Sequence, residues 1–342
     1  KTFFKKSCNF LEKKLKARKA IITNSCTASL EIAALLIDVK PGDEIIMPSY
    51  TFVSTANAFV LRGGKPVFVD IRKDNLNIDE KLIEKSITKK TKAIVVVHYA
   101  GVPCNMDKIV KIGKKYNLFI IEDAAQAIFS KYKNKYCGTI GDIGCFSFHE
   151  TKNITSCEGG AIILNKKNFD RKASIICNKG TDREYFNKSL KKYYSWKGLG
   201  SSYIPSEITC SILYSQLINY KKIMKERKKI WIKYYSTFKN FKSKLFENKT
   251  YLAKDIDTNY HMFFLICRNF NIRTKILTEL KKIGVFSAFH YIPLHKSKFG
   301  SKYFRKKLTV TEELSKKIIR LPLWIGVNQN FILKKIKKIL ND

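Results

Sequence analysis

The chain has 342 residues, 45% of them hydrophobic, which is enough for a large buried core and suggests about two domains. A chain that is disordered as a whole is therefore excluded. The sequence contains 66 Lys and Arg but only 28 Asp and Glu, so its formal net charge is +38.

Lysine carries most of this positive charge, because only 10 of the basic residues are arginines. The lysines are spread along the chain in doublets such as Lys13-Lys14 and Lys337-Lys338, and they do not form one tail. A polyanionic partner is one explanation, and drift of exposed positions in an AT-rich genome is the other. The even spread favours drift, so we do not expect a nucleic-acid partner. The charge would still attract a phosphate-bearing ligand.

Nine cysteines occur without a Cys-x-x-Cys pair, which indicates neither a zinc cluster nor a disulfide framework. Such cysteines are typical of a reduced, cytosolic protein, and we expect no metal site. Apolar runs such as residues 93–97 and 118–121 are far shorter than the roughly 20 residues that cross a bilayer. Residues 1–19 are basic and lack the apolar stretch of a signal peptide. We therefore expect a cytoplasmic protein without a membrane partner.

Between residues 19 and 165, short β-rich apolar runs alternate with helical stretches, which is typical of βαβ units around a mostly parallel sheet. The predicted strands are residues 20–23, 44–48, 66–70, 93–98, 119–122, 143–148 and 161–164. The predicted helices between them cover residues 27–37, 51–61, 79–86 and 106–116. This part of the sequence therefore predicts an α/β fold.

After about residue 214 the pattern changes. The later predicted elements are a long Lys-rich helix up to residue 241, strands at 261–267 and 286–290, and helices at 272–283, 311–319 and 328–340. We expect a large α/β domain over residues 1–215 and a smaller C-terminal α+β domain over residues 216–342. Because no Pro/Gly/Ser-rich linker separates them, the two domains should share an interface.

Three polar segments follow predicted strands, which is where open parallel sheets bind ligands. The first, residues 23–29, is a hydroxyl-rich turn that would aim backbone N–H groups at an anion, or would simply cap a helix. The second, residues 121–126, places Glu122 and Asp123 after a buried run, where a carboxylate needs a cationic partner such as a protonated heterocycle nitrogen. Capping of the next helix is the alternative for these carboxylates.

The third segment, residues 144–153, is a predicted strand that continues into a polar loop carrying Lys152. Burial in such a loop would lower the pKa of Lys152 and make its free amine a nucleophile for Schiff-base chemistry. Taken alone, Lys152 is better explained as a surface lysine, because this chain has so many. Together the three segments supply an anion cradle, a carboxylate and an amine in that order, which is what a pyridoxal phosphate site requires.

With these three segments the sequence resembles the nucleotide-sugar aminotransferases, a family of fold type I pyridoxal-phosphate enzymes, over nearly its whole length. The likeness is closest to members that form dTDP-4-amino-4,6-dideoxygalactose, through residues 147–153, 200–203 and 289–295. The resemblance implies a large cofactor-binding domain, pyridoxal 5′-phosphate as cofactor, and a nucleotide sugar and an amino-acid donor as substrates.

The resemblance also implies roles for individual residues at the cofactor ring. Lys152 would bind the cofactor aldehyde and move the substrate proton, and Asp123 would keep the pyridine nitrogen protonated. Gln126 would lie near the phenolic oxygen, and Phe52 would stack on the ring face.

At the cofactor phosphate, the resemblance implies contacts from Thr27, Ala28 and the Ser147 hydroxyl. Ser202 stands where family members reach this phosphate from the neighbouring subunit. This implies a homodimer with shared active sites.

His290, Tyr291 and His295 would face the nucleotide sugar, although ordinary packing roles stay open for all three. The implied reaction moves an amino group, from glutamate by resemblance, to C4 of a dTDP-4-keto-6-deoxyhexose for cell-surface polysaccharide synthesis. Another nucleotide keto-sugar, aminated at C3 or carried on UDP, is the nearest alternative. A degraded homologue kept for a binding role is a more distant one.

Two features depart from the family pattern. Cys157 stands where the family generally has glycine, and it is strained if that position requires a positive φ. From the resemblance we also expect the N-terminus to be short by a few tens of residues, through either a natural deletion or trimming. By contrast, Lys152 is intact where sugar dehydratases of the family carry His, which favours aminotransfer over dehydration.

Overall fold

The computed structural model describes residues 2–187, 192–239, 246–249 and 257–341. Its larger sheet consists of the strands β1 (Ala20–Thr23), β2 (Glu44–Pro48), β3 (Lys65–Val69), β4 (Thr91–Val97), β5 (Phe119–Asp123), β8 (Ile143–Ser147) and β9 (Gly160–Leu164). A smaller sheet consists of β10 (Phe246–Lys249), β11 (Phe263–Cys267) and β12 (Ile318–Leu321), and a hairpin joins β6 (Lys131–Tyr132) to β7 (Lys135–Tyr136).

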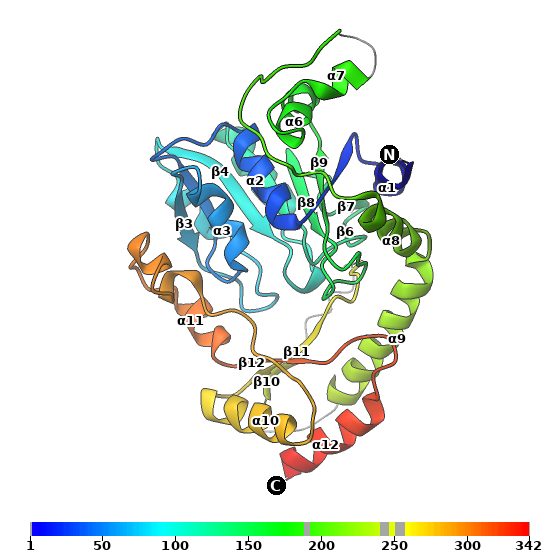
Figure 1. Cartoon of the computed structure of the whole chain (residues 1–342). Coiled ribbons are helices and arrows are strands. Elements are labelled where there is room, and N and C mark those ends of the chain that lie inside the picture. Colours follow the sequence, from blue (N-terminus) through cyan, green and yellow to red (C-terminus); the bar gives the residue numbers. More distant parts are fainter. Residues whose placement is uncertain (1, 188–191, 240–245, 250–256, 342) are drawn as a thin grey trace.

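The α-helices surround these sheets (Figure 1). They are α1 (Thr2–Leu15), α2 (Cys26–Leu36), α3 (Val53–Val60), α4 (Glu80–Ile83), α5 (Met106–Lys115), α6 (Asp170–Cys177), α7 (Arg183–Asn187), α8 (Glu207–Ile218), α9 (Tyr220–Lys239), α10 (Phe270–Lys282), α11 (Thr309–Ser315) and α12 (Gln329–Asn341). The long helix α9 runs from the side of the larger sheet to the smaller one (Figure 1).

The larger sheet has the strand order β1-β9-β8-β5-β4-β2-β3. Its strands from β8 to β3 are parallel, whereas β9 runs antiparallel to β8 and β1 runs antiparallel to β9. The predicted mostly parallel sheet and the α/β fold class are therefore confirmed. Because the strands from β8 to β3 are parallel, their carboxyl ends meet at one edge of the sheet.

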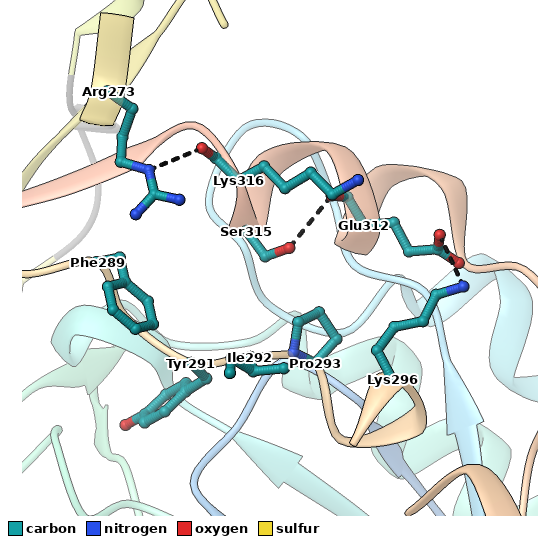
Figure 2. A pocket seen from close by; sticks show the side chains of 9 residues that line it. All are labelled: Arg273, Phe289, Tyr291, Ile292, Pro293, Lys296, Glu312, Ser315 and Lys316. Carbon is teal, nitrogen blue, oxygen red and sulfur yellow. Dashed lines mark hydrogen bonds and ion pairs between the residues drawn. The ribbon is translucent and has the colours of Figure 1, made fainter. Parts of the chain in front are cut away.

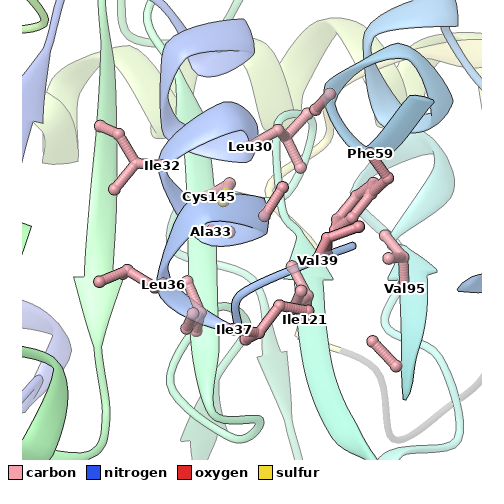
Figure 3. Packing of buried hydrophobic residues seen from close by; sticks show 14 of the residues in the cluster. Leu30, Ile32, Ala33, Leu36, Ile37, Val39, Phe59, Val95, Ile121 and Cys145 are labelled. Atoms are coloured by element: carbon pink, nitrogen blue, oxygen red, sulfur yellow. The ribbon is translucent and has the colours of Figure 1, made fainter. Parts of the chain in front are cut away.

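Both faces of the larger sheet are covered. Successive residues of a strand face opposite sides, so Ile45 and Met47 of β2 belong to the cluster under α2, α3 and α6, while Ile46 belongs to the cluster under α5. Figure 3 shows Leu30 and Ala33 of α2 lying over the strands of the sheet. Burial on both faces explains why the strands read as continuous apolar runs.

The smaller sheet connects two hydrophobic clusters. One of its faces packs against α9, α10 and α12, with Trp231 in that cluster. Its other face contributes Phe264 and Ile318 to a cluster with Tyr50 and Tyr99, which follow β2 and β4. The smaller sheet therefore lies over the carboxyl ends of the larger sheet's strands.

Two predicted elements near the C-terminus are wrong. Residues 286–290 form no strand, since only Ala288 makes an isolated bridge to Arg320. The predicted helix 311–319 ends at Ser315, and β12 follows it. β12 has four residues and pairs with a strand about 50 residues earlier, so local periodicity does not reveal it.

Other differences concern boundaries and omissions. The predicted division between residues 215 and 216 falls within α8, which ends at Ile218. Residues 240–241 of the predicted long helix lie outside the described part of the chain. The sequence patterns gave no indication of α1, which packs with α8 beneath the larger sheet through Leu11, Leu15 and Leu213.

Candidate active site

A cavity of about 400 Å³ lies where the carboxyl ends of β5 and β8, the start of α2, and β12 meet. Eight of the eleven predicted site residues line this cavity, which we call the catalytic cavity: Thr27, Phe52, Asp123, Gln126, Ser147, Lys152, His290 and Tyr291. The topology thus brings together side chains that are far apart in the sequence.

Asp123, the last residue of β5, is buried and held by two donors. The Thr55 hydroxyl donates to its Oδ2 at 2.7 Å, and the Ala125 backbone N–H donates to its Oδ1 at 3.1 Å. Burial raises the pKa of Asp123, although these hydrogen bonds oppose the shift. A protonated heterocycle nitrogen beside this carboxylate would supply the missing counter-charge.

Glu122, the neighbouring carboxylate, has a structural role. It accepts hydrogen bonds from the backbone N–H groups of Gly138, Ile140 and Gly141 and contacts the His98 ring at 2.9 Å. It does not line the catalytic cavity. Of the two predicted carboxylates, only Asp123 is therefore available to a ligand there.

Lys152 lies in the turn after β8, where its backbone N–H donates to the His149 carbonyl at 2.9 Å. Its side chain lines the catalytic cavity, and burial lowers its pKa despite the nearby Asp123. Among the described residues, its ammonium group has no hydrogen bond or ion pair. Lys152 is therefore a desolvated amine facing an enclosed space, which is what a nucleophile for an aldehyde requires.

The start of α2 forms an anion cradle. Ser25 is the N-cap, and its hydroxyl accepts the backbone N–H of Ala28 at 3.0 Å, so the capping role weighed for this turn is also present. The Thr27 hydroxyl contacts Ser54 Oγ at 2.8 Å. A side chain at Gly160 would approach the backbone of Ser25 to 2.4 Å, so only glycine lets β9 begin this close to the helix terminus.

Gln126 and Tyr291 are hydrogen-bonded to each other in the wall of the catalytic cavity. Gln126 Oε1 accepts from the Ala100 N–H at 2.7 Å, and its Nε2 donates to the Tyr291 hydroxyl at 2.9 Å. Phe52 is 56% exposed, and its ring centroid lies 6.3 Å from that of Tyr291. An exposed aromatic ring at the cavity wall is available to stack on a bound ring.

His290 stacks on Tyr291 with ring centroids 3.9 Å apart, and its Nδ1 lies 2.7 Å from the Tyr99 hydroxyl. Burial, together with the positive charges of Arg320 and Lys152, lowers the pKa of His290 to about 2. His290 is therefore a neutral imidazole at physiological pH.

Ser202 and His295 lie outside the catalytic cavity. Ser202 is exposed, and its carbonyl accepts from the Asn24 side chain at 3.1 Å. His295 is buried, with Nδ1 at 2.6 Å from the Ser49 hydroxyl and Nε2 at 3.2 Å from Glu312. Within one chain, neither side chain reaches the residues around Lys152.

The structure adds three residues that the sequence interpretation missed. Thr55 positions Asp123, and His261 lines the catalytic cavity with its Nδ1 at 2.8 Å from Asn153 Oδ1. Arg320 of β12 also lines the cavity, and its Nε is buried without a hydrogen-bond partner in the described structure. Nothing in the local sequence around Arg320 marked it as a site residue. The one available signal was that it is an arginine.

Cys157 has φ 68°, so the position where the family generally has glycine does take the left-handed conformation. The next two residues, Glu158 and Gly159, line the catalytic cavity. An L side chain in this conformation costs about 1 kcal/mol. Cys157 is therefore a strained, exposed residue at the edge of the site.

These observations fit pyridoxal 5′-phosphate. The helix terminus with the Ser147 hydroxyl suits its phosphate, Asp123 suits its ring nitrogen, and the Lys152 amine suits its aldehyde. No group of three or more His, Cys, Asp or Glu side chains in the described ranges is placed to hold a metal ion. None of the described helices is both long and apolar enough to cross a membrane.

Fold and site together define a fold type I aminotransferase that uses pyridoxal 5′-phosphate. The chain belongs to the DegT/DnrJ/EryC1/StrS aminotransferase family, which it matches over residues 4–339. The members of this family are pyridoxal-phosphate-dependent sugar aminotransferases, so the predicted enzyme class and cofactor are confirmed.

Individual relatives match most of the length of the chain. The uncharacterized protein MJ1066 of Methanocaldococcus jannaschii is 36% identical over 94% of this chain and 86% of its own length. GDP-perosamine synthase of Escherichia coli O157:H7 is 30% identical over 94% of this chain and 86% of its own length. The solved structure of Spr1654 from Streptococcus pneumoniae in its PLP form has a TM-score of 0.88 and 26% identity, covering 99% of this chain and 91% of its own.

Proposed function

We propose that the protein transfers an amino group from L-glutamate to C4 of a dTDP-4-keto-6-deoxyhexose. The product would be dTDP-4-amino-4,6-dideoxygalactose, a precursor for cell-surface polysaccharide. The observation that carries this proposal is that one enclosed cavity holds the unpaired Lys152 amine, the buried Asp123 carboxylate and a helix N-terminus. Sugar amination is the activity of the family, and the particular sugar, nucleotide and donor are our proposal.

When bound, pyridoxal phosphate supplies an electron sink for the carbon that loses its proton. Asp123, fixed by Thr55, keeps the proton on the ring nitrogen, which maintains the capacity of that sink. The Lys152 amine, whose pKa is lowered by burial, would take the proton from the substrate carbon and deliver it to C4′ of the cofactor, on the other side of the nitrogen that joins the two carbons. The same residues serve both halves of the cycle, first with the amino donor and then with the keto-sugar.

Arg320 supports an amino-acid donor. Its guanidinium lines the same cavity as Lys152 and has no acidic partner among the described residues. A guanidinium in an enclosed space binds a carboxylate through charge-assisted hydrogen bonds, and every α-amino acid carries one. We assign Arg320 to the donor carboxylate.

The proposal includes a cytoplasmic homodimer. The exposure of Ser202 and its position outside the catalytic cavity are compatible with a contact to a cofactor phosphate in a neighbouring subunit. The two-domain division at residues 215–216 is also part of the proposal.

A second candidate is the same reaction on a different nucleotide sugar, with the amino group placed at C3 or with another nucleotide carrier. GDP-perosamine synthase, a relative with a GDP-linked product, favours this alternative. A degraded homologue with only a binding role is disfavoured, because Lys152, Asp123, Gln126 and Ser147 are all present and line one cavity.

The test is the visible absorption of the purified protein with pyridoxal phosphate, compared with Lys152→Ala and with the control Lys114→Ala on an exposed part of α5. We expect a Lys152-dependent cofactor band that glutamate bleaches and that dTDP-4-keto-6-deoxyglucose then restores, with an amino sugar detected by mass spectrometry. A folded protein without a Lys152-dependent band would contradict the enzyme assignment. A bleached band that only UDP- or GDP-linked keto-sugars restore would establish the second candidate.

A further inference from the structure

The segment that leads into β11 contacts the loop that carries Lys152. Asn259 and His261 of this segment are buried, as is Asn153, the residue that follows Lys152. The Asn153 amide nitrogen donates to the Asn259 carbonyl at 2.7 Å, and Asn153 Oδ1 lies 2.8 Å from His261 Nδ1. The His261 ring also lines the catalytic cavity. These contacts place the imidazole between the Lys152 loop and the space that Lys152 faces.

The hydrogen bonds of Asn153 determine which nitrogen of His261 carries the hydrogen. If the Asn153 amide were turned over, its oxygen would face the Asn259 carbonyl oxygen at 2.7 Å, and two acceptors at that distance repel each other. The orientation of the amide therefore follows from its partners, and Oδ1, which can only accept, faces His261 Nδ1. His261 Nδ1 then carries a hydrogen and donates it to Asn153.

His261 is a neutral imidazole at physiological pH. Burial lowers its pKa well below the usual value for histidine, and the positive charges of Lys152, Arg227 and Arg320 lower it further. A neutral imidazole with its hydrogen on Nδ1 has a lone pair on Nε2, which can only accept. Within the described ranges, Nε2 has no hydrogen-bond partner, and it is not among the fully enclosed unpartnered atoms. This nitrogen is therefore an acceptor open to the catalytic cavity.

Lys152 supplies a matching donor. Its ammonium group lines the same cavity and has no hydrogen bond to any described residue. Of the charges that lower the pKa of His261, that of Lys152 has the largest effect, as expected for a nearby cation. The other ionisable groups around Lys152 are Asp123 of β5, Cys26 of α2 and Arg320 of β12. Asp123 is the strong acceptor among them, and in the proposed function it faces the cofactor ring. This leaves His261 Nε2 as an acceptor for the Lys152 amine.

We propose that His261 is a positioning residue whose Nε2 accepts a hydrogen bond from the Lys152 amine and holds that amine beside the substrate carbon. The hydrogen bond directs one N–H towards His261, so the nitrogen lone pair points away from the ring. A neutral acceptor orients the amine without adding a negative charge, whereas a carboxylate would favour the ammonium form, which cannot take a proton. The inference rests on the proposed function, in which Lys152 moves the substrate proton.

The first experiment measures Lys152 in protein loaded with pyridoxamine phosphate, a form in which Lys152 is not joined to the cofactor. Competitive acetylation with acetic anhydride over a range of pH, read by mass spectrometry, gives the pH at which the amine loses its proton. The variants are His261→Phe, which keeps a ring without an acceptor, and His261→Gln, whose side-chain oxygen can accept. The control is Met262→Leu, which changes the next residue, also buried but not lining the catalytic cavity.

We expect the midpoint of Lys152 acetylation to move to lower pH in His261→Phe, because the ammonium form loses its acceptor. The midpoint should stay close to the wild-type value in His261→Gln and in Met262→Leu. A residue that only fills space would not produce this difference between Phe and Gln.

The second experiment is the glutamate half-reaction, run with ordinary glutamate and with glutamate deuterated at its α-carbon. In His261→Phe the rate at saturating glutamate should fall about 10- to 100-fold, while the apparent affinity for glutamate stays unchanged. The deuterium isotope effect should increase, because proton transfer becomes the slower step. His261→Gln should recover most of the rate.

A wild-type acetylation midpoint together with a wild-type rate in His261→Phe would overturn the inference. Equal losses in His261→Phe and His261→Gln, with weaker cofactor binding in both, would overturn it as well, since they would show a packing role. In either case bleaching of the wild type by glutamate leaves the proposed function standing. A wild type that glutamate does not bleach, with an acetylation midpoint that depends on His261, would contradict the proposed function and not the hydrogen bond.

Discussion

The catalytic cavity and a neighbouring space, the outer pocket, meet at Tyr291 but hold their charges in different ways. In the catalytic cavity, Asp123 is buried and fixed by hydrogen bonds from Thr55 and Ala125. Burial raises the pKa of Asp123 and lowers the pKa of Lys152, so both shifts favour the neutral form of the group.

The outer pocket has a volume of about 530 Å³ and is lined by residues of α10, α11 and the segment around Pro293 (Figure 2). Its cations are Arg273, Lys296 and Lys316. In the outer pocket, the Lys316 side chain is exposed and the Glu312 carboxylate is neutralised by its neighbours.

This difference shows that proton transfer and ligand binding place different requirements on the charged groups of a site. Proton transfer requires groups whose pKa values are tuned by burial and whose positions are fixed before substrate arrives. Binding of an anion requires only accessible positive charge. Substitutions of the residues that transfer protons should therefore change rates, and substitutions of residues that only bind a substrate should change affinities.

The largest expected effect is that of Asp123→Asn, which should lower the rate of the glutamate half-reaction by about 10²–10³-fold. The neutral amide cannot stabilise a protonated ring nitrogen. Stopped-flow absorbance measures the rate, and dTDP calorimetry on the same variant should show unchanged affinity. A matching loss of dTDP affinity would contradict the division between proton transfer and binding.

The same substitution should stabilise the cofactor-free protein. The folded pKa of Asp123 is raised above its unfolded value, so its contribution to stability is present at acid pH and is lost as the pH rises through the folded pKa. Asn does not ionise, so its contribution to the stability of the folded protein does not fall as the pH rises. Differential scanning calorimetry of the cofactor-free proteins should give a higher Tm for Asp123→Asn at neutral pH, and the difference should shrink at acid pH.

Arg320→Gln should raise the KM for glutamate roughly 10- to 100-fold, because charge-assisted hydrogen bonds to the donor carboxylate are lost. Its effect on dTDP affinity should be small, since we assign Arg320 to the donor carboxylate and not to the nucleotide. Steady-state kinetics with varied glutamate measures the first effect. A selective loss of dTDP affinity with normal glutamate kinetics would instead assign Arg320 to the nucleotide.

Thr55→Val should slow the glutamate half-reaction about tenfold, because Asp123 loses the donor at 2.7 Å. Thr55→Ser keeps the hydroxyl and should restore most of the rate, which separates hydrogen bonding from packing. Asp123 should also titrate at higher pH in Thr55→Val, visible as a shift in the pH dependence of the cofactor band. An unchanged pH profile would argue against this positioning role.

The smallest effect is expected for Cys157→Gly. Relief of the left-handed strain contributes about 1 kcal/mol, and the greater flexibility of unfolded glycine offsets about half of it. The free energy of unfolding should therefore rise by about 0.5 kcal/mol in urea titrations, with unchanged activity. A destabilised variant would show that φ 68° costs little at this position.

Some site residues were predictable because their chemistry follows a local pattern. Asp123 ends a strongly apolar strand and Lys152 lies in the turn that follows another, and parallel strands bring such ends together. Cys157 was identified by comparison with a glycine position, and its φ confirms the reason given.

Other residues were not predictable, because their positions depend on non-local pairing. Arg320 lies in a strand whose partner, β11, is about 50 residues away, and the local pattern favoured a helix over residues 311–319, which includes the first two residues of that strand. Thr55 is one of many hydroxyl residues, and only the placement of α3 beside the end of β5 makes it a donor to Asp123. The cations of the outer pocket could not be separated from the other lysines and arginines by sequence.

The segment from Ala288 to Leu294 is tied to both sheets. Ala288 exchanges backbone hydrogen bonds with Arg320 of the smaller sheet, while Tyr291 accepts from Gln126 and the Leu294 N–H donates to the Ser49 carbonyl beside the larger one. Opening the smaller sheet away from the larger one breaks these contacts together. The two halves of the chain are therefore coupled in a single cooperative unfolding unit, so heat should melt both sheets at one temperature.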